Sequence, residues 1–313
     1  RRAAPDGPLR VLHLLSQRPS LTGSGITLDA LTRAAAARGW EQWAVVGVPA
    51  DDPAPAVGPL PRARIDPLVF GRPPLTFALP GMSDVMPYPS SRFAALGPAQ
   101  LRAYVYAWRG QIARSVERAR PDVIHAHHVW LMSATLKDAA PGVPAVVHCH
   151  ATGLRQLELC PHLRPQVVQG NARNERFVVL HHGHAAALAE ALQIPVERIT
   201  VVGAGYREDL FLPPPSAGPR GQRLLYVGKL SRAKGLPWLL DAVERLTRRR
   251  PGLELHVAGA GAGPEGEALR RRVEGLAPSC VYHGMLDQRR LAGLMQRSAV
   301  CVLPSLFEGL PLV

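Results

Sequence analysis

Cysteines, aromatic residues and long apolar runs are scarce in this sequence, and each scarcity excludes a class of protein. Four cysteines among 313 residues are too few for a disulfide-built scaffold, which favours a reducing compartment and predicts a cytoplasmic location. No run of about 18 apolar residues occurs, so no membrane-spanning helix is expected. Aromatic residues make up only 5%, and the arginines are scattered, which argues against a nucleic-acid partner.

Lysine is scarcer still. Of the 37 basic residues 34 are arginine, and the three lysines are Lys137, Lys229 and Lys234. The net charge of +13, with abundant Ala, Gly and Pro, is typical of a GC-rich genome. Anionic substrates, or a peripheral contact with an anionic membrane, are the functional alternatives. Two lysines within one short loop are a sharper signal than the net charge.

The chain is long enough for two domains, since 47% of its residues are hydrophobic. Apolar strands alternate with helical patterns, which predicts α/β domains with parallel sheets. We expect a tail over 1–8, a first domain over 9–212, a Pro-rich linker over 213–222 and a second domain over 223–313. The chain starts at Arg1 and stops inside a motif, so we interpret it as a fragment of a longer protein.

The loop 228–235 follows a predicted strand over 224–227 and precedes a helix that begins near Leu236. It contains Lys229 and Lys234. Free backbone N–H groups and the dipole at a helix N-terminus favour an anion, and cationic side chains add to this preference. A phosphate or diphosphate is the simplest ligand. The alternative is a solvated basic turn.

A single carboxylate stands in the apolar segment at the end of the chain. Glu308 follows a predicted strand over 300–303. A carboxylate in apolar surroundings is costly unless it has hydrogen-bonding partners, and sugar hydroxyls would be suitable. The alternative is an acid in the first turn of a helix, where it complements the dipole.

Three segments of the second domain together resemble a known family. Gly228, Lys229, Leu230, Lys234 and Gly235 match its first motif, Gly259 and Gly261 its second, and Pro304, Ser305, Glu308, Gly309 and Pro311 its third. The order and spacing resemble the retaining glycosyltransferases of family 4, also called group 1. Ala260 replaces the usual acidic residue, and the family's second Glu would fall at position 316, past Val313.

The resemblance implies the GT-B fold, in which two Rossmann-like, doubly wound parallel-sheet domains face each other across a cleft. It also implies transfer of a hexosyl group from a nucleotide-diphosphate sugar to an acceptor, with retention and without a metal or other cofactor. Lys229 and Lys234 would hold the diphosphate, and Glu308 would hold hydroxyls of the donor sugar. The other implied donor-binding residues are Gly228, Gly259, Met285, Gly309 and Leu310.

A glycine pair follows the first predicted strand, which spans 10–15. Gly23 and Gly25 precede a helix expected over 27–38 and would let backbone approach a ligand. A tight turn is the alternative. The resemblance favours the first interpretation, because the family keeps a Gly-rich loop near the donor phosphates at this point.

Histidines gather in two segments of the first domain. His127 and His128 end the sequence DVIHAHH, and His150 follows a strand predicted over 144–147. The resemblance places His127 beside the transferred sugar, as a catalytic residue with Glu308, and His150 at the cleft on the acceptor side. For any one of these residues, and most of all for His128, a structural role is the alternative.

The group His148, Cys149, His150, Cys160 and His162 suggests zinc, but its spacing matches no common pattern. We therefore predict no metal site. Three alternative functions stay open: a GT-B protein that binds a nucleotide or partner without transfer, a same-fold sugar-nucleotide epimerase, and a basic nucleic-acid-binding protein. Affinity that falls steeply with salt and ignores Lys234 would identify the last.

Overall fold

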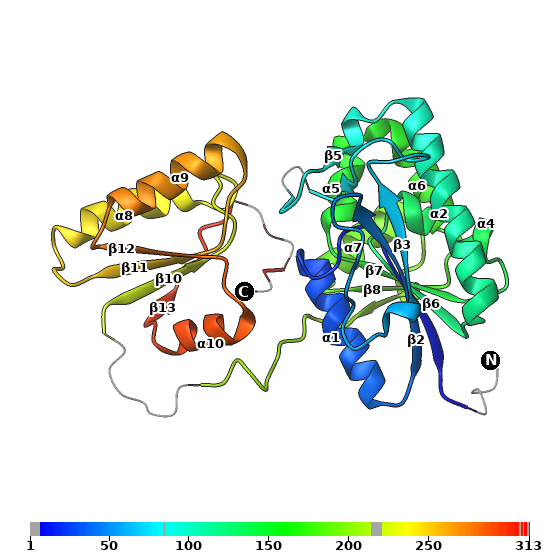
Figure 1. Cartoon of the computed structure of the whole chain (residues 1–313), viewed down its shortest axis with the longest axis horizontal. Helices are drawn as coiled ribbons and strands as arrows, with labels where there is room; N and C mark the ends of the chain where they lie inside the picture. Colours follow the sequence, from blue (N-terminus) through cyan, green and yellow to red (C-terminus); the bar gives the residue numbers. More distant parts are fainter. Residues whose placement is uncertain (1–6, 84–85, 214–220, 307, 309, 312) are drawn as a thin grey trace. The chain divides into compact units, whose positions relative to one another are not determined.

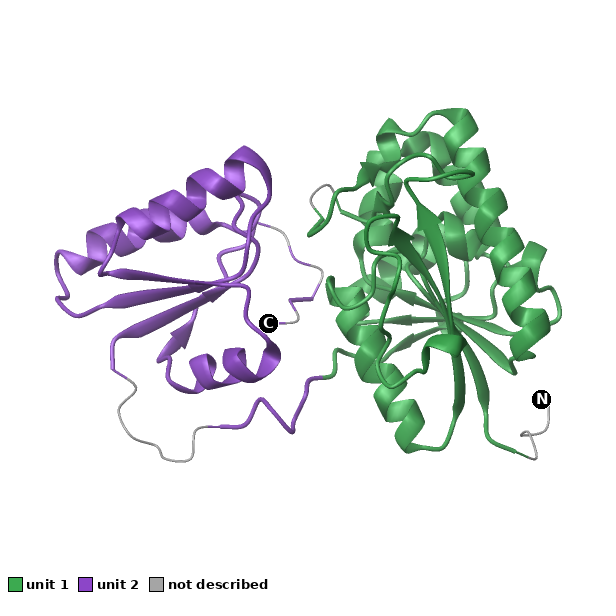
Figure 2. Ribbon diagram, viewed as in Figure 1, with its two compact units in different colours: residues 1–205 green, residues 206–313 purple. Residues whose placement is uncertain are grey.

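The computed structural model describes residues 7–83, 86–213, 221–306, 308, 310–311 and 313. The chain forms two compact units, residues 1–205 and 206–313 (Figure 2). Most of the predicted linker 213–222 lies outside the described residues. Each unit is an α/β domain with an all-parallel main sheet, so the predicted fold class is confirmed.

The first unit contains a seven-stranded sheet in the order β3-β2-β1-β6-β7-β8-β9 (Figure 1). Its strands are β1 (Arg10–Leu15), β2 (Glu41–Pro49), β3 (Ile65–Phe70), β6 (Val123–His127), β7 (Ala145–Cys149), β8 (Arg176–Val179) and β9 (Ile199–Val201). The two-residue strands β4 (Pro80–Gly81) and β5 (Ser91–Arg92) pair only with each other.

The helices of this unit follow the strands as in a doubly wound fold. They are α1 (Gly23–Ala37), α2 (Pro98–Ala119), α3 (Leu131–Ala134), α4 (Leu136–Ala139), α5 (Thr152–Leu159), α6 (Arg164–Asn171) and α7 (His182–Leu192). Short 3-10 turns cover Arg62–Arg64, Phe93–Ala95, Pro161–Leu163 and Val196–Arg198.

The two faces of this sheet pack against different helices. Alternate residues of β1, such as Leu12 and Leu14, join a large buried cluster with Trp108 of α2. Leu15 points to the opposite face, where it packs with Leu28 of α1. This alternation follows from the two-residue period of a strand, and it leaves β1 buried on both faces.

One local prediction for the first unit was wrong. The helix expected over 27–38 begins four residues earlier, at Gly23, because the Thr22 side chain caps it by accepting a 3.2 Å hydrogen bond from the Gly25 N–H. Residues 49–90 are rich in Pro, Gly and Asp and predict an irregular excursion with short strands near Val69 and Phe77, of which the strand near Val69 is confirmed. They contain β3, which pairs with β2 over six residues as an edge strand of the main sheet.

The second unit has a four-stranded sheet in the order β12-β11-β10-β13. The strands are β10 (Arg223–Val227), β11 (Glu254–Ala258), β12 (Cys280–Gly284) and β13 (Val300–Cys301), and the helices are α8 (Leu236–Thr247), α9 (Gly263–Gly275) and α10 (Gln288–Gln296). Helices α8 and α9 cover one face through Leu240 and Val273, and α10 covers the other through Leu294 (Figure 1).

The strand order reverses once in each sheet. In the first unit the chain moves outward from β1 to β3 and then resumes on the other side of β1 with β6. In the second unit the same reversal lies between β10 and β13. Parallel α/β sheets bind ligands at the carboxyl ends of the strands beside such a switch point.

Among the described residues, no helix has the length and apolar character needed to cross a bilayer.

Candidate active site

The switch point of the second unit is built from three hydrogen-bonded loops. The Gly228 and Leu230 N–H groups donate to Ala258 and Ala260 carbonyls, at 3.0 and 3.1 Å, which ties the loop after β10 to the loop after β11. The Leu306 N–H donates to the Ala233 carbonyl at 3.0 Å, which adds the segment after β13. The three segments of the sequence motifs therefore form one surface.

Lys234 and Glu308 meet on this surface. The Lys234 ammonium lies 2.6 Å from Glu308 Oε1, and the two side chains are 29% and 24% exposed. The Ser305 hydroxyl donates to the same carboxylate oxygen at 2.7 Å. The carboxylate in an apolar segment thus has two partners, which removes the penalty that the sequence indicated. Both groups stay accessible enough to exchange these partners for a ligand.

Lys229 lies in the same loop, four residues past Leu225 of β10. Burial, and secondly the nearby positive charge of Lys234, lower the pKa of the Lys229 ammonium below its usual value of 10.5. Two cations that repel each other are stabilised by an anion placed between them. The Tyr226 hydroxyl fixes the backbone here by donating to the Lys229 carbonyl at 2.6 Å.

Glycines allow these loops to touch. Gly259 has a φ of +136°, and a Cβ there would collide with the Gly228 carbonyl oxygen. Gly235 has a φ of +73°, and a Cβ there would collide with the Pro304 carbonyl oxygen. Gly259, which is predicted to bind donor, therefore also has a packing role that explains why it lacks a side chain.

The remaining predicted donor residues have less definite surroundings. Met285, which directly follows β12, is 70% exposed. Leu310 is half-buried, and Gly309 lies outside the described residues.

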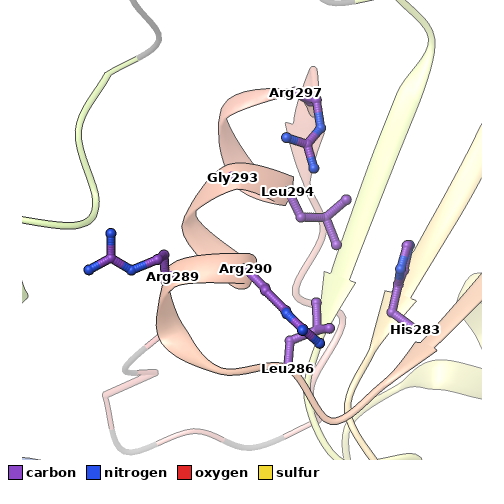
Figure 3. A pocket seen from close by; sticks show the side chains of 7 residues that line it. All are labelled: His283, Leu286, Arg289, Arg290, Gly293, Leu294 and Arg297. Carbon is purple, nitrogen blue, oxygen red and sulfur yellow. The ribbon is translucent and has the colours of Figure 1, made fainter.

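A hollow of about 430 Å³ in the same unit lies beside α10 (Figure 3). Leu286 and Leu294 form its apolar floor, while Arg289 points away from His283. The residues lining it are His283, Leu286, Arg289, Arg290, Gly293, Leu294 and Arg297. Neither Lys229 nor Lys234 nor Glu308 is among them, so the hollow and the motif loops are different surfaces.

The switch point of the first unit is organised by Gln17, in the loop after β1. Its Oε1 accepts hydrogen bonds from Ser24 of α1 at 2.9 Å and from His128 Nε2, after β6, at 3.2 Å. The other ring nitrogen of His128, Nδ1, lies 3.0 Å from the Thr152 hydroxyl at the start of α5. This network joins the ends of β1, β6 and β7. Sequence reasoning missed Gln17, Ser24 and Thr152, although the short polar run over 16–18 directly after β1 was a signal for Gln17.

His128 is structural in this arrangement. It is buried, both of its ring nitrogens have partners, and its φ is +72°. Burial, and secondly the proximity of His148, lower the pKa of the His128 imidazole to about 3. At neutral pH the ring is therefore an uncharged connector between two loops, the role that was the alternative in the sequence.

His127 and His150 lie together at the neighbouring strand ends. His127 Nδ1 is 2.9 Å from His150 Nε2, and the rings are stacked with centroids 5.1 Å apart. Burial is the largest cause, followed by the neighbouring imidazoles, of a pKa well below 6.5 for both rings. His127 is fully buried and His150 is partly exposed. A neutral imidazole can donate and accept hydrogen bonds, so this pair can orient a hydroxyl without adding positive charge.

Gly23 and Gly25 belong to the first turn of α1, not to a loop. A Cβ on Gly25 would lie 2.6 Å from the Ser20 backbone nitrogen. This close packing favours the alternative interpretation of Gly25, in which the glycine is required by a tight turn. The first turn of α1 nevertheless begins beside Gln17, at the edge where His127 and His128 lie.

The five residues that suggested zinc in the sequence come together only in part, because His148 and His150 meet while the other three lie elsewhere. His148 and Cys149 are consecutive in β7 and point to opposite faces, with Cys149 in the main core. Cys160 is also buried in that core, and its Sγ lies 3.6 Å from Gln156 Oε1. His162 is exposed.

Comparison with known proteins gives a consistent result. Residues 22–205 match the family model of a glycosyl transferase 4-like domain, and residues 221–313 match the model of glycosyl transferases group 1. A glycogen synthase of Mycobacterium tuberculosis is 30% identical over 230 residues, covering 70% of this chain and 54% of that protein. The chain spans about half the length of the curated relatives it matches.

Solved structures show the same fold. A sucrose-phosphate synthase from Thermosynechococcus elongatus has a TM-score of 0.69 at 20% identity, covering 97% of this chain and 77% of that one. An Anabaena protein solved with UDP and glucose has a TM-score of 0.58 at 17% identity, covering 96% and 76%. The fold is therefore GT-B.

Proposed function

Because the chain belongs to the group 1 glycosyl transferases, with a glycosyl transferase 4-like first unit, we propose that it transfers a sugar from a nucleotide-diphosphate sugar to an acceptor. The sugar in this proposal is a hexose, and its anomeric configuration is retained. The Anabaena protein of the same fold was solved with UDP and glucose, which supports a nucleotide donor.

One observation carries the proposal. Lys234 and Glu308, which are 74 residues apart in sequence, lie 2.6 Å apart beside the switch point of the second unit. A cation for phosphate and a carboxylate for hydroxyls are thereby placed side by side, at the edge where α/β sheets bind ligands. In a nucleotide-diphosphate sugar, the diphosphate is attached to one carbon of the sugar ring and hydroxyls are attached to the neighbouring carbons.

Lys229 and Lys234 are proposed to hold the diphosphate and to stabilise the charge that develops when it leaves. Preorganised charges aimed at a leaving group commonly supply a large part of a rate enhancement. Two ammonium groups perform the electrostatic task that a divalent metal performs in other transferases, so the proposed reaction needs no metal or other cofactor. The backbone N–H groups of Gly309 and Leu310 are proposed to add hydrogen bonds to phosphate.

Glu308 is proposed to accept hydrogen bonds from hydroxyls of the donor sugar. His127 is proposed to contact the transferred sugar near its anomeric carbon, with His150 beside it on the acceptor side. A neutral imidazole suits this position, because it does not repel the positive charge that develops on the sugar.

Nucleotide binding is tested first, by thermal shift with UDP, GDP, ADP and TDP and without metal. We expect one diphosphate to raise the melting temperature and Lys234→Ala to abolish that rise. Arg232→Ala is the matched control. It removes a positive charge from the same loop, but Arg232 is exposed and its guanidinium lies over Trp238. No shift with any nucleotide, or an equal loss in both variants, would contradict the proposed donor site.

Product analysis then separates transfer from the two other functions considered for this fold. With the sugar of the selected nucleotide, a transferase releases nucleoside diphosphate and forms a new glycoside. An epimerase changes the configuration of the sugar, and a binding protein leaves the donor unchanged. The NMR coupling constant of the anomeric proton in the product tests retention.

The proposed location is the cytoplasm, in keeping with a chain that has only four cysteines among its 313 residues. The acceptor is not specified by the loops described above. We also propose a peripheral contact with an anionic membrane, because the chain has a net charge of +13. Sedimentation with anionic and with neutral vesicles tests that contact, and equal sedimentation with both would exclude it.

A further inference from the structure

Four histidines share one face of the sheet in the first unit. They are His13 of β1, His125 and His127 of β6, and His148 of β7. The strand registers pair His13 with His125 and His127 with His148, so the rings form a continuous stripe across three strands. His150 extends the stripe past the end of β7, with its ring centroid 4.1 Å from that of His148.

Two groups of three within this stripe have the geometry of a metal site. In the group His127, His148 and His150, one ring nitrogen from each residue lies within 4.8 Å of the others. The same holds for the group His13, His125 and His127. The sequence prediction missed both groups, because it considered only residues close to each other along the chain.

Hydrogen bonds distinguish the two groups. Both ring nitrogens of His13 have partners, Gln42 Oε1 at 3.1 Å and His125 Nδ1 at 3.3 Å. Among the described residues, neither ring nitrogen of His148 has a hydrogen-bond partner, nor has His127 Nε2, although all three atoms are buried. His148 is only 4% exposed and lies face to face with His127 and His150. Buried polar atoms normally have partners, so these three nitrogens point to a ligand.

We propose that His127, His148 and His150 bind a divalent transition-metal ion of the zinc class. Imidazole nitrogen is a preferred ligand of Zn²⁺ and Co²⁺, whereas Mg²⁺ and Ca²⁺ prefer oxygen. Three histidines leave one position of a tetrahedral ion open to water or another small ligand. Each of the three rings has one nitrogen within 4.8 Å of the others, which can offer a lone pair to the ion when the ring is uncharged.

Only small movements are needed to form this site. Nitrogen ligands around zinc lie roughly 3.3 Å apart, given metal–nitrogen bonds of about 2.0–2.1 Å. Rotation of the His148 ring costs no hydrogen bond within the described part of the chain. The 2.9 Å contact between His127 Nδ1 and His150 Nε2 already holds the other two rings together, and the partly exposed His150 offers a route of entry.

This inference does not depend on the proposed function, and the ion has no part in the proposed transfer. One consequence does rest on that function. An ion bound by His127 would engage the imidazole that is proposed to contact the transferred sugar, so zinc would inhibit transfer and a chelator would restore it.

The test uses Co²⁺ as a spectroscopic probe on the metal-free chain. Co²⁺ bound by three imidazoles gives visible ligand-field absorption, and we expect saturation at one ion per chain. Zn²⁺ should displace the colour, and Mg²⁺ should not. His148→Gln should weaken binding by about tenfold or more, since one of three ligands is lost. His150→Gln is the second variant, because its partly exposed side chain can be replaced with less risk to folding.

Two histidine variants serve as controls. His162→Gln changes an exposed histidine, and His13→Gln changes the other group, so both should bind as the unmodified chain does. Melting curves establish that each variant is folded. The proposal is overturned if no saturable binding is seen, if His148→Gln and His150→Gln bind unchanged, or if His13→Gln is the variant that loses the ion.

Discussion

The two units place different chemistry at the same topological position. Beside β10 and β13 the loops carry two lysines and a carboxylate, and Lys234 and Glu308 form an ion pair. Beside β1 and β6 the corresponding edge carries Gln17 and neutral histidines, whose rings bond to one another, to an amide and to a hydroxyl. The fold supplies the edge in both units, while the side chains decide what each edge can do.

This difference shows how a scarce residue can be used. Two of the three lysines stand at the charged edge of the second unit. The third, Lys137, is 8% exposed in the first unit and forms a 2.7 Å ion pair with Glu175 beside the start of β7. In the proposed function the charged edge holds an anion and the neutral edge orients hydroxyls.

Removing charge from the second unit should have the largest effect. We expect Lys234→Ala and Glu308→Gln each to lower kcat by about 10²–10³-fold, as the loss of a group that stabilises a transition state commonly does. Lys234→Ala should also weaken nucleotide binding, whereas Glu308→Gln should preserve it, because the amide cannot repel phosphate. Nucleoside diphosphate release and thermal shift measure the two effects, with Arg232→Ala as the control.

Adding a side chain where the charged loops touch should come next. Gly259→Ala combines a positive φ with a collision against the Gly228 carbonyl, so we expect a loss of about 2–4 kcal/mol in unfolding free energy. Gly263→Ala is the matched control. Gly263 also has a positive φ, of +68°, but nothing lies within 4 Å of an added Cβ, so the cost should be about 1–2 kcal/mol. Equal losses in urea denaturation would show that the contact is unimportant.

Variants of two adjacent histidines, His127 and His128, test the neutral edge of the first unit. His127→Asn should lower kcat by about 10–100-fold and preserve nucleotide binding, because the proposed sugar contact is lost. His128→Ala should mainly lower stability, by about 1–3 kcal/mol, since Gln17 and Thr152 lose a buried partner. Activity and urea denaturation of both variants separate the two roles. The reverse pattern would exchange the assignments.

Removing the ion pair between Lys137 and Glu175 in the first unit should have the smallest effect. Glu175→Gln should lower stability at pH 7 by about 1–2 kcal/mol, a value discounted for solvent screening because 47% of the Glu175 side chain is exposed. Nucleotide binding should not change.

The pH dependence of this variant has a defined sign. Burial alone would raise the pKa of the Glu175 carboxyl, but hydrogen bonds from Lys137 and the Ala145 N–H lower it below its usual 4.5. Unmodified protein should therefore be more stable than Glu175→Gln above pH 4.5, and the difference should vanish as the pH falls through the lowered pKa. Melting curves from pH 7 to pH 3 measure this, and a constant difference would exclude the ionised pair as its cause.

The fold was predictable because its signals are local. The strand expected over 10–15 coincides with β1, and the motif around Lys229 and Lys234 lies in a strand–loop–helix unit as expected. The family resemblance, carried by the spacing from Lys229 to Glu308, is confirmed by the family models. The roles of the individual site residues stay predictions.

The features that were missed depend on contacts between distant segments. Strand registers decide which histidines meet, and register follows from packing rather than from the residues of one strand. Gln17 looks like an ordinary loop residue until β6 brings His128 to it, with Thr152 bound to the other side of that ring. The early start of α1 was missed because glycine disfavours helix, whereas a Thr22 cap and close packing of Gly25 outweigh that preference.

The contact between Gly228 and Gly259 also has an evolutionary consequence. The Gly228 carbonyl occupies the space that a side chain on Gly259 would need, and the Pro304 carbonyl occupies the space that a side chain on Gly235 would need. A mutation in one loop is therefore tolerated only if its neighbour retreats, so the three motif segments of the second unit are expected to change in concert. Selection that altered the specificity of this surface would have to act on side chains that project from the loops, while the glycine framework beneath them stayed fixed.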